Sequence, residues 1–397
     1  MTTTTAPVAT GRLDVRVCSS WNDLETLRTQ WNDLLNTDTT FSIFATPEWL
    51  ASWWRAYGGG KELCSLAFFS ADGELVGLAP LYFDNGKRLG RKSRMLRLVG
   101  DGSGDSDNLD CIIRPGYEDA CFEAFVPWLQ QHEWDLCTLT TLPENSAFGT
   151  KLLGYLHSAG WPVLEQYSPH IVVSLPDSWE TCLAQMNRRS RYTLTKYPKR
   201  LRTRYDVRVY RSTHVDLEKN LSSLFSLHEM RWRRRAQPGV FTNAMRRHFY
   251  RELSAALLAR GWLEFWLMDL DGVTAAAQFS LRFRQTVYSL QEAFDPQYGD
   301  ERPGYALRGE VLQDLIRRGI KGYDFLGGSM SYKTQLGGVE SSYLTIEFAR
   351  PRTLGSARLA LKRFERRARR WAHDSLPQPV ISLLRATLHR VHGISLS

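Results

Sequence analysis

The chain has 397 residues, 43% of them hydrophobic and 23% charged, a composition that supports a large core and excludes a disordered protein. The net charge of +9 comes from clustered Lys and Arg, which suit a phosphorylated cofactor, nucleic acid or an anionic membrane face. The six cysteines form no CxxC pair and no zinc or disulfide spacing, so we expect reduced thiols in a cytoplasmic protein.

The N-terminal residues 1–10 lack the basic and apolar parts of a signal peptide, and we expect a disordered tail there. The sequence has no apolar run near the ~18 residues that a membrane-spanning helix needs. The length of the chain favours two domains over one.

Strand and helix patterns alternate through the first half of the chain. Apolar residues at helical spacing follow an alternating strand pattern, and Thr46 with Pro47 marks a helix start. A polar loop, residues 101–110, carries four aspartates without the glycine and glutamate of a calcium loop. We predict strands at 13–17, 63–69, 74–83, 95–100 and 134–140, a further strand at the end of 101–113, and helices at 19–35, 46–58, 116–132 and 145–159.

The second half follows a similar order. A basic stretch, 186–204, is followed by two helix patterns, three strand patterns and a helix that begins at Pro303 and ends at Gly319. We predict strands at 170–175, 206–210, 262–272, 273–283, 285–295, 323–327 and 342–350, and helices at 216–235, 243–261 and 303–319.

Each half thus carries helices, then antiparallel strands, then a helix and further strands. This order predicts an α/β (α+β) protein with mixed sheets, built as two copies of one plan. We expect an N-terminal lobe at 11–167, a C-terminal lobe at 168–350 and a basic helical tail at 351–397.

The start of the helix at 303–319 is the first candidate site. Gly304 and Ala306 lie where a small residue lets backbone N–H groups approach a phosphate, and the helix dipole favours an anion there. A proline and a glycine at a helix start also fit an ordinary turn. The three strands before the helix and the strand after it strengthen the functional interpretation.

That arrangement resembles the GNAT acyltransferase fold, which holds the pyrophosphate of acyl-CoA at this helix start. The stretches "FSLHEMRWRRRAQPGVF", "QEAFDPQYGDERPGYAL" and "GYDFLGGSMSYKTQLGG" are similar to the BioF2-like acetyltransferase domain of CelD/BcsL-type proteins, relatives of the Fem peptidyltransferases. The N-terminal stretches "TPEWLASWWRAYG" and "GELVGLAPLY" also look like this family. The resemblance implies two GNAT-like lobes with acyl-CoA as co-substrate. No calcium or zinc motif stands out in the sequence, so we expect no metal.

The resemblance also implies residues that bind the cofactor and act on it. Arg302, Gly304, Tyr305 and Ala306 are the expected CoA contacts, although Glu301 stands where the family has Arg or Gln. Lys333 would stabilise a developing oxyanion, and Tyr332 could protonate the leaving thiolate. If this segment is extended, only one of the two side chains faces the site. A solvated lysine and a core tyrosine are the structural alternatives.

Several other polar side chains are candidates for the chemistry or for acceptor binding. Glu292 is the favoured general base, and His228 is a second candidate because it shares a helix face with Arg231. Structural roles in the sheet or helix fit each of these residues as well, and Asp324 could simply pair with an arginine. The expected acceptor-binding residues are Arg188, Arg191, Arg231, Trp232, Gln278, Gln291 and Asp324.

Two basic segments suggest anionic partners. Residues 188–204 interleave Lys and Arg with tyrosines, which suits tRNA, CoA phosphates or a sugar-nucleotide diphosphate as well as a merely solvated helix face. The tail could dock on an anionic membrane surface through apolar contacts and arginines. The expected apolar contacts are Leu359, Leu361, Phe364 and Trp371, and the basic residues are Arg358, Lys362, Arg363, Arg366, Arg367, Arg369 and Arg370.

These patterns favour an acyltransferase that moves an acyl group from acyl-CoA to an amine or hydroxyl of a small-molecule, saccharide or cell-envelope acceptor. Two alternatives remain open at this point. One is Fem-like transfer from aminoacyl-tRNA, and the other is a non-catalytic accessory protein of an exopolysaccharide machine. We expect a cytoplasmic protein, with the basic tail allowing peripheral contact with the inner membrane face.

Overall fold

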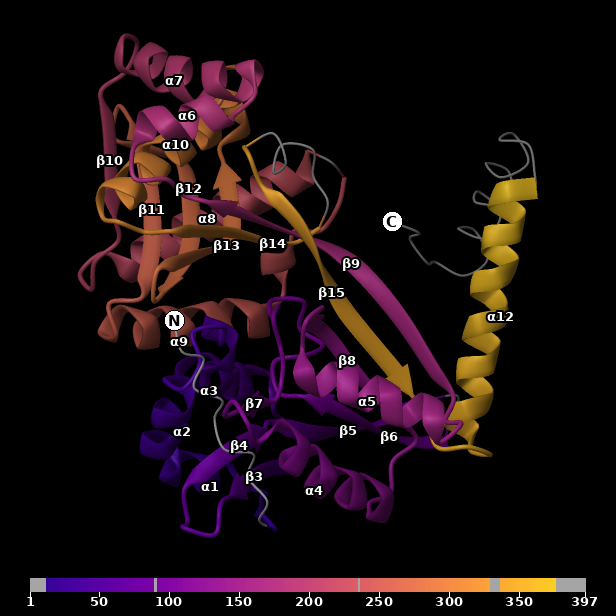
Figure 1. Cartoon of the computed structure of the whole chain (residues 1–397). Coiled ribbons are helices and arrows are strands. Elements are labelled where there is room, and N and C mark those ends of the chain that lie inside the picture. Colours follow the sequence, from indigo (N-terminus) through magenta and orange to yellow (C-terminus); the bar gives the residue numbers. More distant parts are fainter. Residues whose placement is uncertain (1–11, 89–90, 235, 329–335, 376–397) are drawn as a thin grey trace.

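The computed structural model describes residues 12–88, 91–234, 236–328 and 336–375, which form a mixed α/β structure with two sheets (Figure 1). The expected fold class is confirmed. Elements up to residue 174 are β1 Asp14–Cys18, α1 Trp21–Thr26, α2 Arg28–Leu35, η1 Ile43–Ala45, α3 Pro47–Tyr57, β2 Glu62–Leu63, β3 Ser65–Phe69, β4 Leu75–Ala79, β5 Leu81–Arg88, β6 Arg91–Leu98, β7 Ile112–Ile113, α4 Glu118–Gln131, β8 Leu136–Pro143, α5 Ala147–Ser158 and β9 Val163–Ser174.

The later elements run from the basic stretch to the tail. They are α6 Trp179–Gln185, α7 Arg188–Arg202, β10 Val207–Arg211, α8 Leu217–Arg233, η2 Val240–Thr242, α9 Ala244–Ala259, β11 Leu263–Leu270, β12 Val273–Phe283, β13 Thr286–Phe294, η3 Pro296–Glu301, α10 Pro303–Arg317, β14 Gly322–Gly327, β15 Val339–Phe348 and α12 Leu354–Ser375.

Two predicted elements are each divided in the structure. The helix expected at 19–35 breaks at Leu27, whose backbone (φ −90°, ψ 1°) leaves the α-helical region between α1 and α2. The strand expected at 74–83 breaks at Pro80, which has no N–H to continue a ladder, so β4 and β5 belong to different sheets. The short helix α6 and the short strand β2 were not predicted.

The expected repeated plan is visible in the sheets. In the second half, β10, β11, β12 and β13 are antiparallel neighbours, and β14 returns parallel to β13 after α10. In the first half, β8 likewise returns parallel to β6 after α4. Helices α3 and α9 occupy equivalent places in the two copies and pack against each other, with the rings of Trp49 and Phe249 5.3 Å apart.

The two lobes share their last strands. β9 follows the N-terminal helices in sequence but pairs with β14 of the second lobe, and β15 returns to pair with β8 of the first. β9 and β15 also pair with each other along their length, from Val172 opposite Val339 to Val163 opposite Phe348. One 11-stranded sheet therefore runs through both lobes, as the two long strands in Figure 1 show.

This exchange predicts how the protein unfolds. Because neither lobe has a complete sheet without a strand from the other, we expect one cooperative transition in urea. Most tryptophans lie before residue 168, so their fluorescence reports mainly the first lobe, whereas circular dichroism reports both. The two signals should give the same midpoint, and two separated midpoints would show that the lobes unfold independently.

Candidate active site at the split between β13 and β14

A split in the large sheet creates the site. β13 and β14 pair for three residues only, from Thr286 opposite Gly322 to Tyr288 opposite Asp324, and then diverge. The carboxylate of Asp324 accepts the backbone N–H of Leu326 at 2.7 Å, and Leu326 adopts a positive φ of 58°. This local bend turns the end of β14 away from β13 and leaves room between the strands.

A cavity of about 540 Å³ lies at this split. It is bounded by the diverging strands, by the start of α10, by α8 and by the polar loop of the first lobe. Residues that line it include Gly104, Asp105, Asp107, His228, Arg231, Trp232, Gln278, Ser289, Gln291, Glu292, Phe294, Arg302, Gly304, Tyr305, Arg308 and Phe325.

The start of α10 has the properties of an anion site. Its first turn contains no acidic residue and no side-chain cap, and Pro303 has no N–H. Gly304 lines the cavity, and its N–H donates to no group within the described part of the chain. An unpaired N–H at the positive end of a helix dipole favours a phosphate. A Cβ on Gly304 would lie 3.6 Å from Phe294, so the protein itself has room for one.

The equivalent helix of the first lobe lacks these properties. α4 begins with Glu118 and Asp119, and the Glu118 carboxylate already accepts the Gly116 N–H at 2.8 Å. Negative side chains at a helix start repel a phosphate. Of the two equivalent helix starts, α10 is therefore the one suited to an anionic donor.

Glu301, at the position where the family has Arg or Gln, faces α7 and not the cavity. Its carboxylate pairs with Arg200, at 3.1 Å, and with Arg204. These ion pairs neutralise Glu301 and hold the basic helix α7 against the turn that precedes α10. Arg302 follows in a left-handed conformation and lies over the Tyr197 ring, 5.7 Å from its centroid. The surroundings of the turn thus stay positively charged.

Glu292 and His228, the two expected bases, both line the cavity but already have partners. The Glu292 carboxylate accepts from Arg308, whose side chain is 6% exposed. The His228 Nε2 accepts the Trp232 indole N–H at 2.9 Å, which places the ring proton on Nδ1. Burial, with help from Arg231, lowers the pKa of His228 from 6.5 to about 4. A neutral imidazole whose acceptor nitrogen is occupied is a poor base.

The expected acceptor-binding residues divide into two groups. Arg231, Trp232, Gln278 and Gln291 line the cavity, and Gln278 donates to the Tyr323 hydroxyl at 2.9 Å. Arg188 begins α7 and does not line it. The guanidinium of Arg191 caps α6 by donating to the carbonyls of Leu183 and Met186.

Asp324 and Ala306 are buried and contribute to the structure of the second lobe. Asp324 is buried and pairs with His170 of β9 at 2.8 Å, in place of the arginine that we expected. Ala306 is fully buried and packs in the core of the second lobe, whereas Arg302, Gly304 and Tyr305 line the cavity. Lys333 and Tyr332 lie outside the described residues.

The polar loop 101–110 enters the cavity from the other lobe. Asp105 is anchored there by Arg246 at 2.9 Å and by the hydroxyls of Tyr57 and Tyr250. Asp107 accepts the Gly327 N–H at 3.0 Å, at the end of β14. We had assigned no site role to either aspartate, because no pattern within the loop reveals which distant strand it meets.

The comparisons agree with this geometry. The family described as acetyltransferase (GNAT) domain matches residues 188–334. The crystal structure of FemX superposes with a TM-score of 0.57 at 13% identity, covering 80% of this chain and 95% of FemX. A conserved protein of unknown function from Bacteroides thetaiotaomicron VPI-5482 superposes with a TM-score of 0.51 at 10% identity, covering 85% and 100%. No curated protein matches. These likenesses show the fold, and the CelD/BcsL resemblance stays a prediction.

The buried neutral His228 predicts a pH dependence of stability. Its folded pKa lies below the unfolded value, so the unfolded state binds the proton first as pH falls. Lowering the pH from about 7 to about 4 should remove roughly 3 kcal/mol of unfolding free energy through this group. His228→Gln should flatten the stability–pH curve by that amount in urea melts, whereas His214→Gln, at an exposed position, should leave its slope unchanged. Equal slopes in both variants would contradict the assignment.

Proposed function

With residues 188–334 forming an acetyltransferase domain of the GNAT superfamily, we propose that the chain transfers an acyl group from acyl-CoA to an amine or hydroxyl acceptor. The observation that carries the proposal is the Gly304 N–H at the start of α10, which has no acceptor among the described residues and lies beside a cavity between diverging parallel strands. In this proposal the pyrophosphate binds at α10 and the acyl arm enters the split. Beyond Tyr288, β13 no longer pairs with β14 among the described residues, and we propose that this edge of β13 binds an extended ligand.

Charge around the phosphate-binding turn supports the fit of this donor. Arg302 and Arg308 both line the cavity, and Arg308 has its guanidinium fixed by Glu292. Arg200 and Arg204 offset Glu301 at the outer side of the turn. The pyrophosphate would therefore meet a helix dipole and fixed cations at once.

The chemical step requires a base on the acceptor side, and we propose Asp107. Its carboxylate lies in the cavity and is held against β14 by the Gly327 N–H. The acceptor nitrogen or oxygen attacks the thioester carbonyl, loses a proton to Asp107, and the carbon–sulfur bond breaks as the new acyl bond forms. Lys333 remains the proposed oxyanion stabiliser and Tyr332 the proposed proton donor to the thiolate.

The nature of the acceptor rests on the family resemblance, from which we propose a saccharide or cell-envelope precursor. Trp232 and the polar side chains of Gln278 and Gln291 give the acceptor side of the cavity both apolar and hydrogen-bonding surface. Among helices in the described ranges, none is long and apolar enough to cross a membrane.

One observation favours the second candidate donor, aminoacyl-tRNA. The exposed side of α7 carries a stripe of cations beside the phosphate-binding turn, and Lys196 lies 4.6 Å from the Tyr192 ring centroid. The exposed cations of α7 are Arg188, Arg189, Arg191, Lys196, Lys199 and Arg202. A polyanion bound there would show steep salt dependence.

Calorimetric titration of the full chain with acetyl-CoA, longer acyl-CoAs and bulk aminoacyl-tRNA tests the donor. Saturable binding of an acyl-CoA supports the leading proposal, and binding of aminoacyl-tRNA alone, weakened by salt, supports the second. If neither acyl-CoA nor aminoacyl-tRNA binds, the result favours a non-catalytic accessory protein with an acyltransferase fold.

Gly304→Ala tests the phosphate site without disturbing the fold. The added methyl fits beside Phe294 but projects where the pyrophosphate must approach the N–H, so we expect about tenfold weaker acyl-CoA binding. Unfolding free energy should stay equal or rise by up to about 1 kcal/mol, because Ala favours helix. Gly154→Ala in α5, where a Cβ meets nothing within 4 Å, is the matched control and should keep the parent affinity.

Asp107→Asn tests the proposed base. We expect kcat to fall by about 10²-fold or more while acyl-CoA affinity stays unchanged, since the amide keeps its contact with Gly327 but takes no proton. Lys333→Ala should also lower kcat. Asp72→Asn, at an exposed turn of the first lobe, should turn over like the parent. Full activity of Asp107→Asn would assign the base elsewhere.

A further inference from the structure

Helix α12 faces the rest of the protein with its polar and basic side. Lys362 pairs with Glu347 of β15 at 2.5 Å, and Arg363 and Arg366 reach the Val163 carbonyl and the Gln166 side chain of β9. Leu359 is fully buried on the same side. The sequence had suggested Leu359 as an outward apolar contact, and its position on the inner face corrects that expectation.

The opposite side of α12 is apolar and faces solvent. Leu354, Leu361, Phe364 and Trp371 are between 58% and 68% exposed. Their spacings of seven, three and seven residues place them in one stripe along the helix, together with the exposed Ala357, Ala360 and Ala368. An ordinary surface helix buries such a stripe in the core, so α12 is inverted relative to the usual arrangement.

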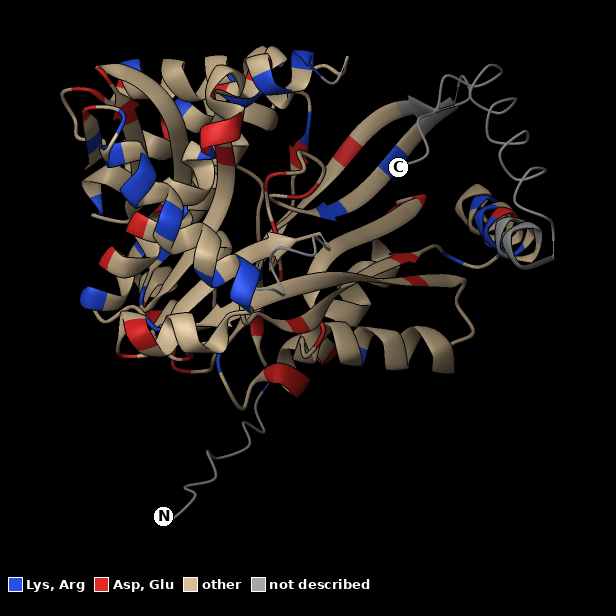
Figure 2. Ribbon diagram, turned by 90° about the horizontal axis from the view of Figure 1, so that it is seen from above, with Lys and Arg blue, Asp and Glu red and all other residues tan. Residues whose placement is uncertain are grey.

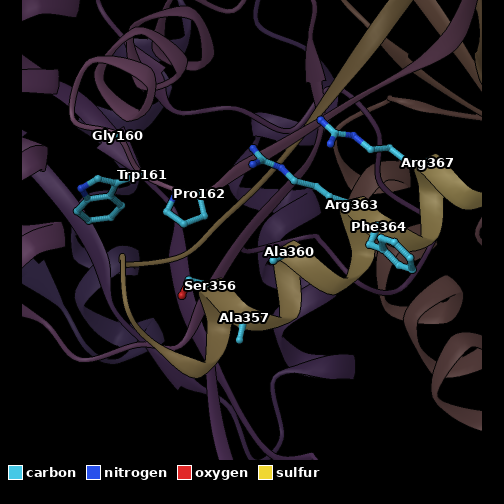
Figure 3. A pocket seen from close by; sticks show the side chains of 9 residues that line it. All are labelled: Gly160, Trp161, Pro162, Ser356, Ala357, Ala360, Arg363, Phe364 and Arg367. Carbon is cyan, nitrogen blue, oxygen red and sulfur yellow. The ribbon is translucent and has the colours of Figure 1, made fainter.

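A hollow of about 570 Å³ adjoins this stripe (Figure 3). Its walls are Trp161 and Pro162, before β9, and the side of α12 that carries Ala360 and Phe364. Arg363 and Arg367 extend along it in one direction in Figure 3. An apolar recess edged by two guanidinium groups suits a group that is part hydrocarbon and part anion.

We propose that α12 docks the protein on an anionic lipid bilayer. The apolar stripe would enter the boundary between headgroups and acyl chains, and the arginines beside it would meet lipid phosphates. Charge favours this occupant, because the helix carries seven Lys and Arg residues against two acidic residues. Figure 2, which views α12 nearly end-on, shows Lys and Arg residues in blue along the helix. A second copy of the helix would bring like charges together, and nucleic acid would leave the apolar stripe exposed.

Vesicle flotation of the full chain tests the proposal. We expect the protein to float with phosphatidylcholine vesicles that contain about 30% phosphatidylglycerol and to stay behind with pure phosphatidylcholine. Phe364→Glu should weaken partitioning by about tenfold or more, because it removes an exposed ring that would enter the bilayer and adds a negative charge. Arg367→Gln should weaken it about fivefold, and salt should weaken the parent.

Two controls separate docking from a damaged fold. Val273→Glu changes a residue that is 51% exposed in the other lobe and should float like the parent, and all variants should keep the parent melting temperature. All six native cysteines are buried, so an Ala360→Cys variant takes an environment-sensitive dye selectively. The dye should shift to the blue on anionic vesicles.

Several results would overturn the proposal. The proposal would be wrong if the parent did not float with anionic vesicles. It would also be wrong if Phe364→Glu floated as well as the parent. A dimer that Phe364→Glu dissociates, without vesicle binding, would assign the stripe to a second copy of the chain. If vesicle binding appears only after residues 376–397 are removed, the partner of the apolar stripe in the full chain is the chain's own C-terminal segment and not a bilayer.

Discussion

The site depends on a backbone pairing that stops early. β13 and β14 are hydrogen-bonded for three residue pairs and then separate, because the Asp324 side chain takes the Leu326 N–H that would otherwise serve the sheet. His170 of β9 holds the same carboxylate from the other side. The bend that opens the cavity is therefore fixed by a strand that the first lobe contributes.

Both lobes repeat one plan, yet they have different tasks. The second lobe keeps a helix start without acids, where an anion is stabilised, while the first places two carboxylates in the equivalent turn. The polar loop of the first lobe extends into the cavity of the second lobe, where the ion pair between Asp105 and Arg246 anchors it. In the proposed reaction, the second lobe would bind the acyl donor and the first lobe would contribute to the acceptor side.

Local patterns in the sequence were sufficient for much of the fold. Pro303 and Gly304 mark the start of α10, and strict apolar patterns mark β11 to β13, because these signals act within a few residues. The partners of Glu292, Glu301 and Asp324 could not be read in this way, since Arg308, Arg200 and His170 meet them through tertiary packing. For the same reason, the part of Asp107 in the cavity was not foreseen, nor was the inward side of Leu359.

The shared strands also govern how the chain matures. β8 and β9 leave the ribosome long before β15, which must later insert between them. Until then the N-terminal half presents two open strand edges, and such edges pair readily with other chains. Synthesis of the last strand is thus the moment at which the first lobe becomes protected from aggregation, and any pause before it prolongs the exposure.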